Sequence, residues 1–194
     1  MIKAVLGLFV AAGVLAGCQD MKKADEANFR SAIQSYLDTR SGLCVGVPGR
    51  QYPYQAEHDS ALAVEDRARL AALEGAGLLR QVGAQDAPRY ELAPAGEPYL
   101  VRGDAQRQGL HDAFCTGRLV VDSITSFTEP ADVGGLKVSR VNYVYHLQDA
   151  AAWLQWSAVQ KNYPELAAFM GPAVQGQALL VLTNKGWIHQ NQFR

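Results

Sequence analysis

The chain has 194 residues, of which 48% are hydrophobic and 19% charged, as in a globular protein and unlike a disordered or fibrous one. Its formal net charge is −1, which excludes an overall basic field that would attract nucleic acid or anionic lipid. The length fits one larger domain or two small packed subdomains.

The first hydrophobic stretch is typical of a secretory signal peptide. Lys3 supplies a positive start, and residues 4–17 are uncharged and mostly apolar. These residues are too few for a membrane-spanning helix, which needs about 20. The stretch ends at Leu15-Ala16-Gly17-Cys18, where a plain signal peptide would have an A-x-A-like cleavage site. We therefore assign residues 1–17 to a signal peptide that lies outside the fold.

Residues 15–18 resemble the lipobox of bacterial lipoproteins. In that family the cysteine thiol receives a diacylglycerol, the signal is cleaved before the cysteine, and the new N-terminus is acylated. The resemblance implies that Cys18 is lipidated, that residues 18–24 are a lipidated tether, and that the lipid attaches the chain to a membrane. Gln19 follows the cysteine instead of an aspartate, which in that family implies the outer membrane, with the protein facing the periplasm. The alternative is a buried N-terminal helix with Cys18 as a core thiol, but the stretch lacks the polar face of a surface helix.

Cys44 and Cys115 are the two cysteines that remain if Cys18 carries lipid. The lipobox resemblance places them in an oxidising compartment, where two thiols tend to be joined. We therefore predict a Cys44–Cys115 disulfide, which would close a loop of about 70 residues and contribute about 4 kcal/mol in the chain-entropy model. Two unpaired buried thiols are the alternative, because spacing along the sequence does not show whether the Cα atoms approach.

The N-terminal half of the mature chain, residues 25–100, is predicted to be largely helical. An apolar stripe at helical spacing indicates a helix over 25–40, and a second helix is predicted over 65–75. Residues 78–82 and 89–94 alternate as the two strands of a hairpin. A helix followed by such a hairpin resembles the recognition helix and wing of winged-helix domains, so we predict a winged-helix-like subdomain.

Charge argues against DNA binding by this subdomain. Residues 65–80 hold three acidic and three basic side chains, so the predicted helix lacks the basic surplus that phosphate contacts need. A periplasmic destination would also separate it from DNA. We therefore expect no nucleic-acid partner and interpret the module as one used for packing or protein contact.

A second subdomain is predicted over residues 114–194, after a polar connector at 101–113. Its pattern predicts an antiparallel sheet with one helix: a strand bent near Asp122-Ser123, an alternating strand over 136–147, a helix that begins near Asp149 and is interrupted at Pro164, and a hairpin over 177–191. The predicted fold class is therefore α+β, with an N-terminal helical, winged-helix-like part packed on a C-terminal antiparallel sheet with one helix.

Four short motifs in this second subdomain resemble those of uncharacterised envelope lipoproteins of proteobacteria. They are Phe114-Cys115-Thr116-Gly117, Phe127-Thr128-Glu129-Pro130, the V-x-Y-x-Y strand at 141–145, and the sequence LTNKGW at 182–187. The resemblance would cover most of the mature chain. Because the motifs are structural, it implies no known activity.

Residues that carry chemistry are few and scattered. The four histidines, His58, His111, His146 and His189, are not spaced as metal ligands with other His, Cys or acidic residues. The chain contains no nucleophile-elbow, zinc-hydrolase, P-loop or dinucleotide-binding motif. We therefore predict no metal, no cofactor and no catalytic residue, although a triad assembled only in space stays open.

Two groups of aromatic residues are candidates for a binding surface. Tyr52, Pro53 and Tyr54 form the predicted contact surface, because Pro53 keeps this loop out of regular structure. The second group would either line a sugar or peptide groove or, as we favour, form a core where the helix crosses the sheet. Its members are Tyr143, Tyr145, Trp153, Trp156, Tyr163 and Trp187.

These observations predict a lipid-anchored envelope protein that is a non-catalytic interaction or scaffold module for another envelope protein. The alternative is a periplasmic small-ligand or glycan binder, or a hydrolase without a recognisable motif. A deep polar cleft with a strongly perturbed carboxylate or histidine would favour that alternative. A filled interior would argue against it.

Overall fold

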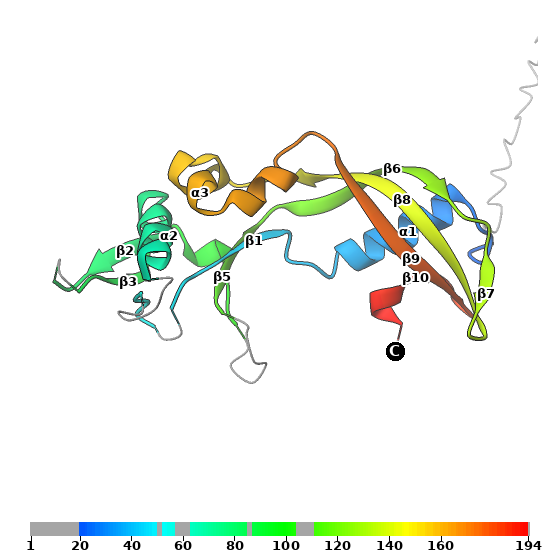
Figure 1. Ribbon diagram of the computed structural model, residues 1–194, viewed down its shortest axis with the longest axis horizontal. Helices are drawn as coiled ribbons and strands as arrows, with labels where there is room; N and C mark the ends of the chain where they lie inside the picture. Colours follow the sequence, from blue (N-terminus) through cyan, green and yellow to red (C-terminus); the bar gives the residue numbers. More distant parts are fainter. Residues whose placement is uncertain (1–19, 50–51, 57–62, 85–86, 104–110, 194) are drawn as a thin grey trace, which may run out of the picture.

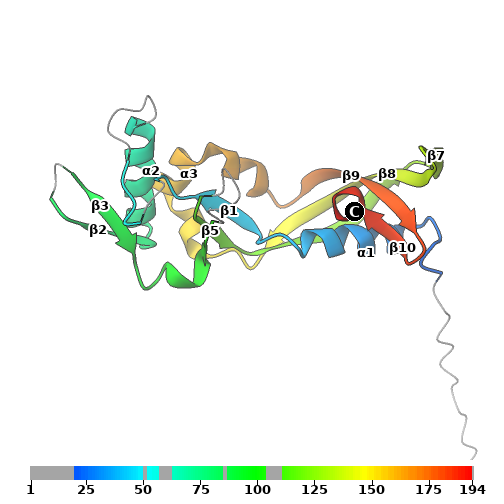
Figure 2. The ribbon, with the colours of Figure 1, turned by 90° about the horizontal axis from the view of Figure 1, so that it is seen from below.

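Two groups of helices and strands lie at opposite ends of an elongated molecule in the computed structural model (Figures 1 and 2). The structure describes residues 20–49, 52–56, 63–84, 87–103 and 111–193. The predicted lipidation residue Cys18 and part of the predicted connector therefore lie outside the described residues. No helix among the described residues is long and apolar enough to cross a bilayer.

The first group, which we name the sheet lobe, consists of one helix and a curled antiparallel sheet. Its elements are α1 (Glu26–Leu37), β6 (Arg118–Phe127), β7 (Ala131–Val133), β8 (Leu136–Gln148), β9 (Val174–Thr183), β10 (Gly186–His189) and the 3-10 turn η4 (Gln190–Gln192). The strand order is β10-β9-β8-β6, and β7 pairs with β8. Helix α1 lies against one face of the sheet (Figure 2).

The sheet curls where its register shifts. The pairing of β6 with β8 is irregular between Val121 and Ser123 and again between Ile124 and Ser126. An extra residue on one strand increases the local twist and bends the strand, as β-bulges do. The predicted bend near Asp122-Ser123 is confirmed.

Helix α1 fills the inner face of this sheet. Asp25 caps the helix by accepting a hydrogen bond from the backbone N–H of Asn28 at 3.0 Å. Phe29 is fully buried, and its ring meets the rings of Phe127 and Trp187 edge-on, with centroids 4.9 and 5.0 Å away. The remaining core residues are Ile33 and Leu37 from α1 and Val121, Ile124, Val141, Tyr143, Ala178 and Leu180 from the strands.

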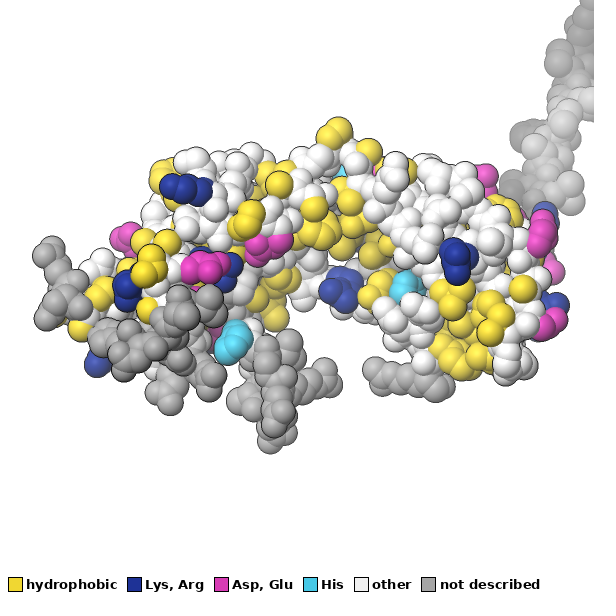
Figure 3. All heavy atoms as spheres, viewed as in Figure 1, with side chains coloured by type: hydrophobic (Ala, Val, Ile, Leu, Met, Phe, Trp, Pro, Cys, Tyr) yellow, Lys and Arg dark blue, Asp and Glu magenta, His cyan; other side chains and the backbone are white. Residues whose placement is uncertain are grey.

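The outer face of the same sheet has an apolar row. Val138 of β8 is opposite Val181 of β9, and Val181 is opposite Ile188 of β10, so the three side chains share one face. Ala131 of β7 continues the row from the other side of Val138. Figure 3 shows hydrophobic side chains gathered on the face of the sheet lobe that is turned to the viewer.

The second group, which we name the distal lobe, is assembled from short elements. It contains β1 (Leu43–Gly46), α2 (Ala63–Gly75), β2 (Leu79–Val82), β3 (Arg89–Leu92), β4 (Leu100–Val101), β5 (Ala113–Thr116) and α3 (Ser157–Asn162), with 3-10 turns η1 (Glu97–Tyr99), η2 (Ala152–Gln155) and η3 (Pro164–Phe169). Its sheets have the orders β1-β5-β4 and β2-β3, and α2 packs on α3.

The distal lobe has its own hydrophobic core. Leu70 and Leu73 from α2 pack with Phe114 from β5 and Leu154 from η2. Tyr163 is also buried here, and its hydroxyl donates to the carbonyl of Gly46 at 2.9 Å. Each lobe is therefore stabilised by a hydrophobic core of its own.

The predicted fold class is wrong. The described chain is mostly β, with one curled antiparallel sheet, two small sheets and only short helices. Helix α1 does not pack with α2 and the β2–β3 hairpin as a winged-helix-like part, because the curled sheet buries its apolar stripe instead. Strand β1 likewise leaves its neighbours in sequence and pairs with β5. Long-range burial overrides the local order that suggested a separate N-terminal half.

Local predictions fared better than the overall architecture. Helix α2, the β2–β3 hairpin, the alternating strand β8 and the β9–β10 hairpin with its turn at 183–186 are confirmed. The single helix expected from Asp149 is wrong, since the structure has η2, α3 and η3 in succession. Strand β8 runs to Gln148, and Asp149 follows it in a left-handed conformation, φ 56°, outside any helix.

Candidate functional site

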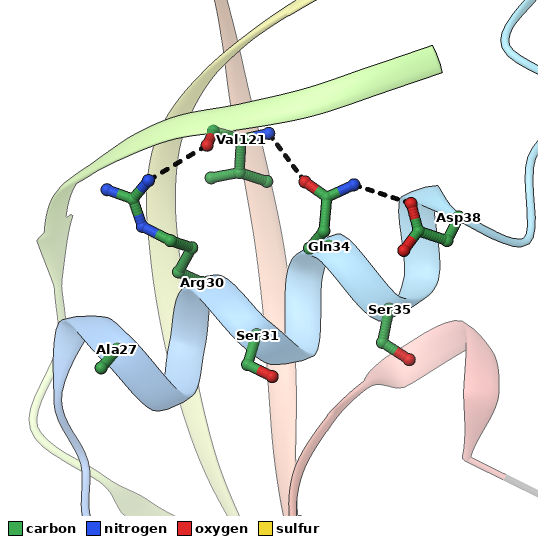
Figure 4. Close-up of a pocket in the computed structure, with 7 residues that line it drawn as sticks. All are labelled: Ala27, Arg30, Ser31, Gln34, Ser35, Asp38 and Val121. Carbon is green, nitrogen blue, oxygen red and sulfur yellow. Dashed lines mark hydrogen bonds between the residues drawn. The ribbon is translucent and has the colours of Figure 1, made fainter.

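A groove follows the exposed side of α1 where the helix passes β6 (Figure 4). We name it the α1 groove, and its volume is about 460 Å³. The lining residues are Ala27, Arg30, Ser31, Gln34, Ser35 and Asp38 of α1 with Val121 of β6. The spacing of the helical residues places them on one face, because side chains three and four positions apart are neighbours on a helix.

The polar residues of the α1 groove cover an open strand edge. β6 is the last strand of its sheet, so one side of its backbone has no strand partner among the described residues. Arg30 Nη1 donates to the carbonyl of Val121 at 3.2 Å, and the N–H of Val121 donates to Gln34 Oε1 at 2.9 Å. Gln34 Nε2 also donates to the carbonyl of Leu119 at 3.0 Å. These side chains replace a neighbouring strand and block edge-to-edge pairing at this position.

Ser31 and Ser35 are the hydroxyl side chains of the α1 groove, and neither contacts the β6 edge in the way that Arg30 and Gln34 do. Both serines are exposed, and in Figure 4 both point away from Val121. Their hydroxyls both donate and accept hydrogen bonds. They are therefore the residues of this groove best placed to meet a binding partner.

A second groove, which we name the junction groove, lies where the two lobes meet. Its volume is about 510 Å³. It is lined by Ser41, Pro98, Tyr99, Val101, Cys115, Thr116, Gly117, Arg118 and Asp149. Val101 is 42% exposed, which gives the groove an apolar rim beside the charged Arg118 and Asp149.

One ion pair separates the two grooves. Arg118 lines the junction groove, Asp38 lines the α1 groove, and both Nε and Nη2 of Arg118 lie 2.9 Å from Asp38 Oδ1. Hydrogen bonds from Gln34 and then from Arg118 lower the pKa of Asp38. The carboxylate therefore stays charged at neutral pH. We name the two grooves, together with the ion pair that lies between them, the trough.

The shape of the trough suits an extended segment better than a small molecule. Small-molecule sites usually bury most of the ligand in an enclosed, largely apolar cavity. Here the lining combines exposed hydroxyls, one ion pair and exposed apolar side chains such as Val101. Such a surface offers hydrogen bonds and apolar contacts along a line.

The predicted disulfide is confirmed. Cys44 and Cys115 stand directly opposite each other on the antiparallel strands β1 and β5, and their sulfur atoms are bonded. Cys44 is exposed, whereas Cys115 is buried and lines the junction groove. β1 follows α1 in the chain and β5 leads into β6, so the bond ties together the two segments that leave the sheet lobe here.

The two tyrosines of the predicted aromatic contact surface differ in how far they are buried. Tyr52 is 51% exposed, whereas Tyr54 is only 2% exposed. Their rings meet edge-on with centroids 5.4 Å apart, and the peptide bond between Tyr52 and Pro53 is cis. The guanidinium of Arg102 lies 5.6 Å from the centre of the Tyr52 ring. Of the two tyrosines, Tyr52 is the one that offers surface to a partner.

Tyr54 belongs to a polar cluster that sequence reasoning missed. Its hydroxyl donates to Asp112 Oδ2 at 2.5 Å, and Asp112 also accepts from Arg102 Nη1 and from the N–H of Gly103, both at 2.8 Å. Burial acts to raise the pKa of Asp112, but hydrogen bonds from Tyr54, Gly103 and Arg102 outweigh it and lower that pKa. Burial and the neighbouring carboxylate raise the pKa of Tyr54. No sequence signal joined these residues, because Tyr54 and Asp112 are 58 positions apart.

Most of the second aromatic group lies inside the two cores. Tyr143 and Trp187 are buried in the sheet lobe, and Trp153 and Tyr163 are buried in the distal lobe. Tyr145 is partly buried against the core of the sheet lobe, and Trp156 is 49% exposed. The four buried rings are packed against apolar neighbours and do not line a sugar or peptide groove.

The described histidines are apart from one another. His146 lies 2.7 Å from Asp122 on the outer face of the sheet, and both side chains are partly exposed. His189 is buried, its ring stacks on Tyr36 with centroids 3.7 Å apart, and its Nδ1 accepts from the N–H of Asn191. Within the described residues, no three His, Cys, Asp or Glu side chains are grouped to hold a metal ion.

No protein-family model, no curated protein and no solved structure matches this chain. What the trough binds is therefore inferred from the residues that line it.

Proposed function

We propose that this protein is a lipid-anchored envelope protein that serves as an interaction module for another envelope protein. The lipobox-like Leu15-Ala16-Gly17-Cys18 motif after a signal-like stretch supports the anchor. A thioether-linked diacylglycerol together with an N-terminal acyl chain would hold the protein firmly, since one chain alone binds only marginally. Gln19 after the cysteine supports the outer membrane, with both lobes in the periplasm.

The observation that carries this proposal is the way the chain directly after the motif is held. Trp187 Nε1 donates to the carbonyls of Lys22 at 3.1 Å and Lys23 at 3.2 Å. Asn28 Nδ2 donates to the carbonyls of Asp20 at 2.8 Å and Lys23 at 2.9 Å. The predicted tether is thus fastened to the sheet lobe from Asp20 onward. The close packing of residues 20–23, directly after the motif, supports a mature chain that starts at the cysteine.

The trough supports the interaction half of the proposal. It runs from Ser31 and Ser35 on α1, past the Asp38–Arg118 pair, to Val101 at the edge of β4. An extended segment of a partner would find hydroxyl groups at one end and an apolar rim at the other. Transient interfaces likewise combine apolar contacts with hydrogen bonds.

The anchor is tested by replacing the cysteine of the motif. Cys18→Ala in the full-length chain is expected to release the protein from the membrane fraction and to remove the lipid mass from its N-terminal peptide in mass spectrometry. Because this substitution also blocks lipid-dependent signal cleavage, uncleaved precursor is expected as well. The matched control is Val64→Ala, which should stay membrane-bound because Val64 is 72% exposed on α2. A wild-type N-terminal peptide that carries no lipid would contradict the proposal.

The interaction is tested by photo-cross-linking in cells. A photoreactive amino acid at Ser31, Ser35 or Val101 is expected to give one defined adduct with another envelope protein. The control position is Val64, which is exposed on α2 and lines neither groove. Adducts of equal yield from Val64 and from the trough positions would contradict the trough as the binding surface.

A further inference from the structure

Three chain segments meet at one end of the sheet lobe. Val138 lies opposite Val181, which places the start of β8 beside the end of β9. The β7–β8 turn and the β9–β10 turn therefore lie at the same end. The backbone of Met21 packs there as well, since a Cβ added to Gly186 would lie 2.8 Å from the Met21 carbonyl oxygen. Figure 1 shows β7 and the beginning of the described chain together at this end, and we name it the anchor end.

Covalent geometry keeps the proposed lipid close to the anchor end. Cys18 and Asp20 are two residues apart, so their Cα atoms are at most about 7 Å from each other. Asp20 is fixed, because its carbonyl accepts from Asn28 and its carboxylate accepts from the N–H of Lys22 at 3.0 Å. The polar layer of a bilayer is roughly 5–8 Å thick on each side. A lipid on Cys18 therefore holds this end of the lobe against the headgroups.

Large apolar side chains are exposed at the anchor end. Met21 is 61% exposed, and Val133, at the last position of β7, is 59% exposed. The turn between Val133 and Leu136 is Gly134-Gly135, with φ angles of 58° and 80°, which is the tight type I′ geometry that makes a narrow tip. The half-buried outer row of Val138 and Ile188 begins just behind this tip.

The charged residues of the anchor end are mixed in sign. Four exposed lysines lie here, Lys22, Lys23, Lys137 and Lys185. Lys23 is 3.8 Å from Asp25, and Lys137 is opposite Asp132 in the β7–β8 hairpin. Figure 3 shows basic and acidic side chains next to one another at this end. Such a surface suits zwitterionic headgroups, and the long lysine side chains can extend to phosphate groups.

From these observations we propose that the anchor end rests on the phospholipid surface, with Met21 and Val133 inserted among the headgroups. This inference rests on the proposed lipid anchor at Cys18. It specifies the second membrane contact and thereby the orientation of the protein. The 13-residue strand β8 leads away from the anchor end and spans up to about 40 Å. The distal lobe and the junction groove are thus held away from the bilayer, where a partner can reach them.

The experiment uses the lipidated full-length protein in vesicles of phosphatidylethanolamine and phosphatidylglycerol. Met21→Cys and Val133→Cys are each labelled with an environment-sensitive fluorophore. The new thiol is the reactive one, because Cys18 carries lipid and Cys44 is bonded to Cys115. The matched control is Val64→Cys, an apolar position in the distal lobe that is at least as exposed as the two test positions.

The expected result is a blue-shifted emission at positions 21 and 133, and about twofold stronger quenching there by nitroxide-labelled lipid than at position 64, because the probes enter the interfacial layer. Flotation of the vesicles is measured on the same samples. If the protein floats but all three probes report water, the proposed contact is wrong while the anchor stands. A blue shift without quenching by labelled lipid would mean contact with a second protein copy and would also overturn it. If the protein does not float, the anchor itself fails.

Discussion

The two lobes of this protein are built in different ways. In the sheet lobe, the single strand β8 pairs with three others, β6, β7 and β9. Core residues alternate along the long strands β6, β8 and β9. In the distal lobe the strands have only two to four residues, and the core draws on segments from β1 to η3. Short strands contribute few backbone hydrogen bonds and are marginal by themselves.

The distal lobe compensates with links between side chains. The Cys44–Cys115 bond, the Tyr54–Asp112–Arg102 cluster and the hydrogen bond from Tyr163 to Gly46 each join segments that are distant in sequence. The sheet lobe has no disulfide within its described residues. One lobe therefore depends on its apolar core and sheet ladder, whereas the other depends more on individual cross-links, and this difference can be tested.

The largest effect is expected in the core of the sheet lobe. Phe29→Ala should lower the free energy of unfolding by about 3–5 kcal/mol, because it leaves a cavity between α1 and the sheet. Phe29 is 0% exposed and contacts both Phe127 and Trp187. Chemical denaturation followed by tryptophan fluorescence measures the loss. Val64→Ala is the control and should change stability by less than about 0.5 kcal/mol.

The disulfide should matter next, and mainly for the distal lobe. The double variant Cys44→Ala/Cys115→Ala is expected to cost about 2–4 kcal/mol, since the unfolded chain gains freedom. Hydrogen exchange should accelerate most at β1, β5 and α2 and least at the centre of β8. Equal acceleration in both lobes would contradict the idea that the bond supports the distal lobe in particular.

A smaller effect is expected from the buried hydroxyl of the polar cluster. Tyr54→Phe removes the hydrogen bond to Asp112 and should cost about 1 kcal/mol. Asp112 keeps its bonds from Arg102 and Gly103, so no buried charge is left without a partner. The matched control is Tyr52→Phe, whose hydroxyl accepts a longer, exposed bond from the N–H of Leu92 at 3.3 Å. A control loss as large as that of Tyr54→Phe would refute the cluster as a specific link.

The smallest effect is a pH dependence of the sheet lobe. Burial lowers the pKa of His189, whose ring stacks on Tyr36 while Arg40 donates to the Tyr36 hydroxyl. The folded state therefore binds a proton less readily than the unfolded state. The stabilisation is complete above the ordinary histidine pKa near 6.5 and declines as the pH falls below it.

This pH effect can be assigned by comparing His189→Gln with the wild type. Unfolding at pH 7.5 and pH 5.5 is expected to show a loss at the lower pH that is smaller in the variant. An identical pH difference in His189→Gln and wild type would show that other groups cause it.

Local patterns allowed several elements to be predicted before their packing was known. The alternation in β8, the turn at 183–186 and the helix before the β2–β3 hairpin were all predicted with nearly the observed bounds. The disulfide followed from an even pair of cysteines and an inferred compartment. The trough was not foreseen, because Asp38 and Arg118 are 80 residues apart and meet only when α1 packs beside β6.

Sequence alone determined the periodicity of the strands, the turn residues, the cysteine pair and the lipobox-like motif on which the proposed anchor rests. Only the tertiary structure decided that α1 leaves its neighbours for the curled sheet, that β1 pairs with β5 and that Tyr54 is buried while Tyr52 is exposed. The physical reason is that backbone geometry and side-chain period act over a few residues. Burial of an apolar face depends on which surface, however distant in sequence, removes the most of it from water.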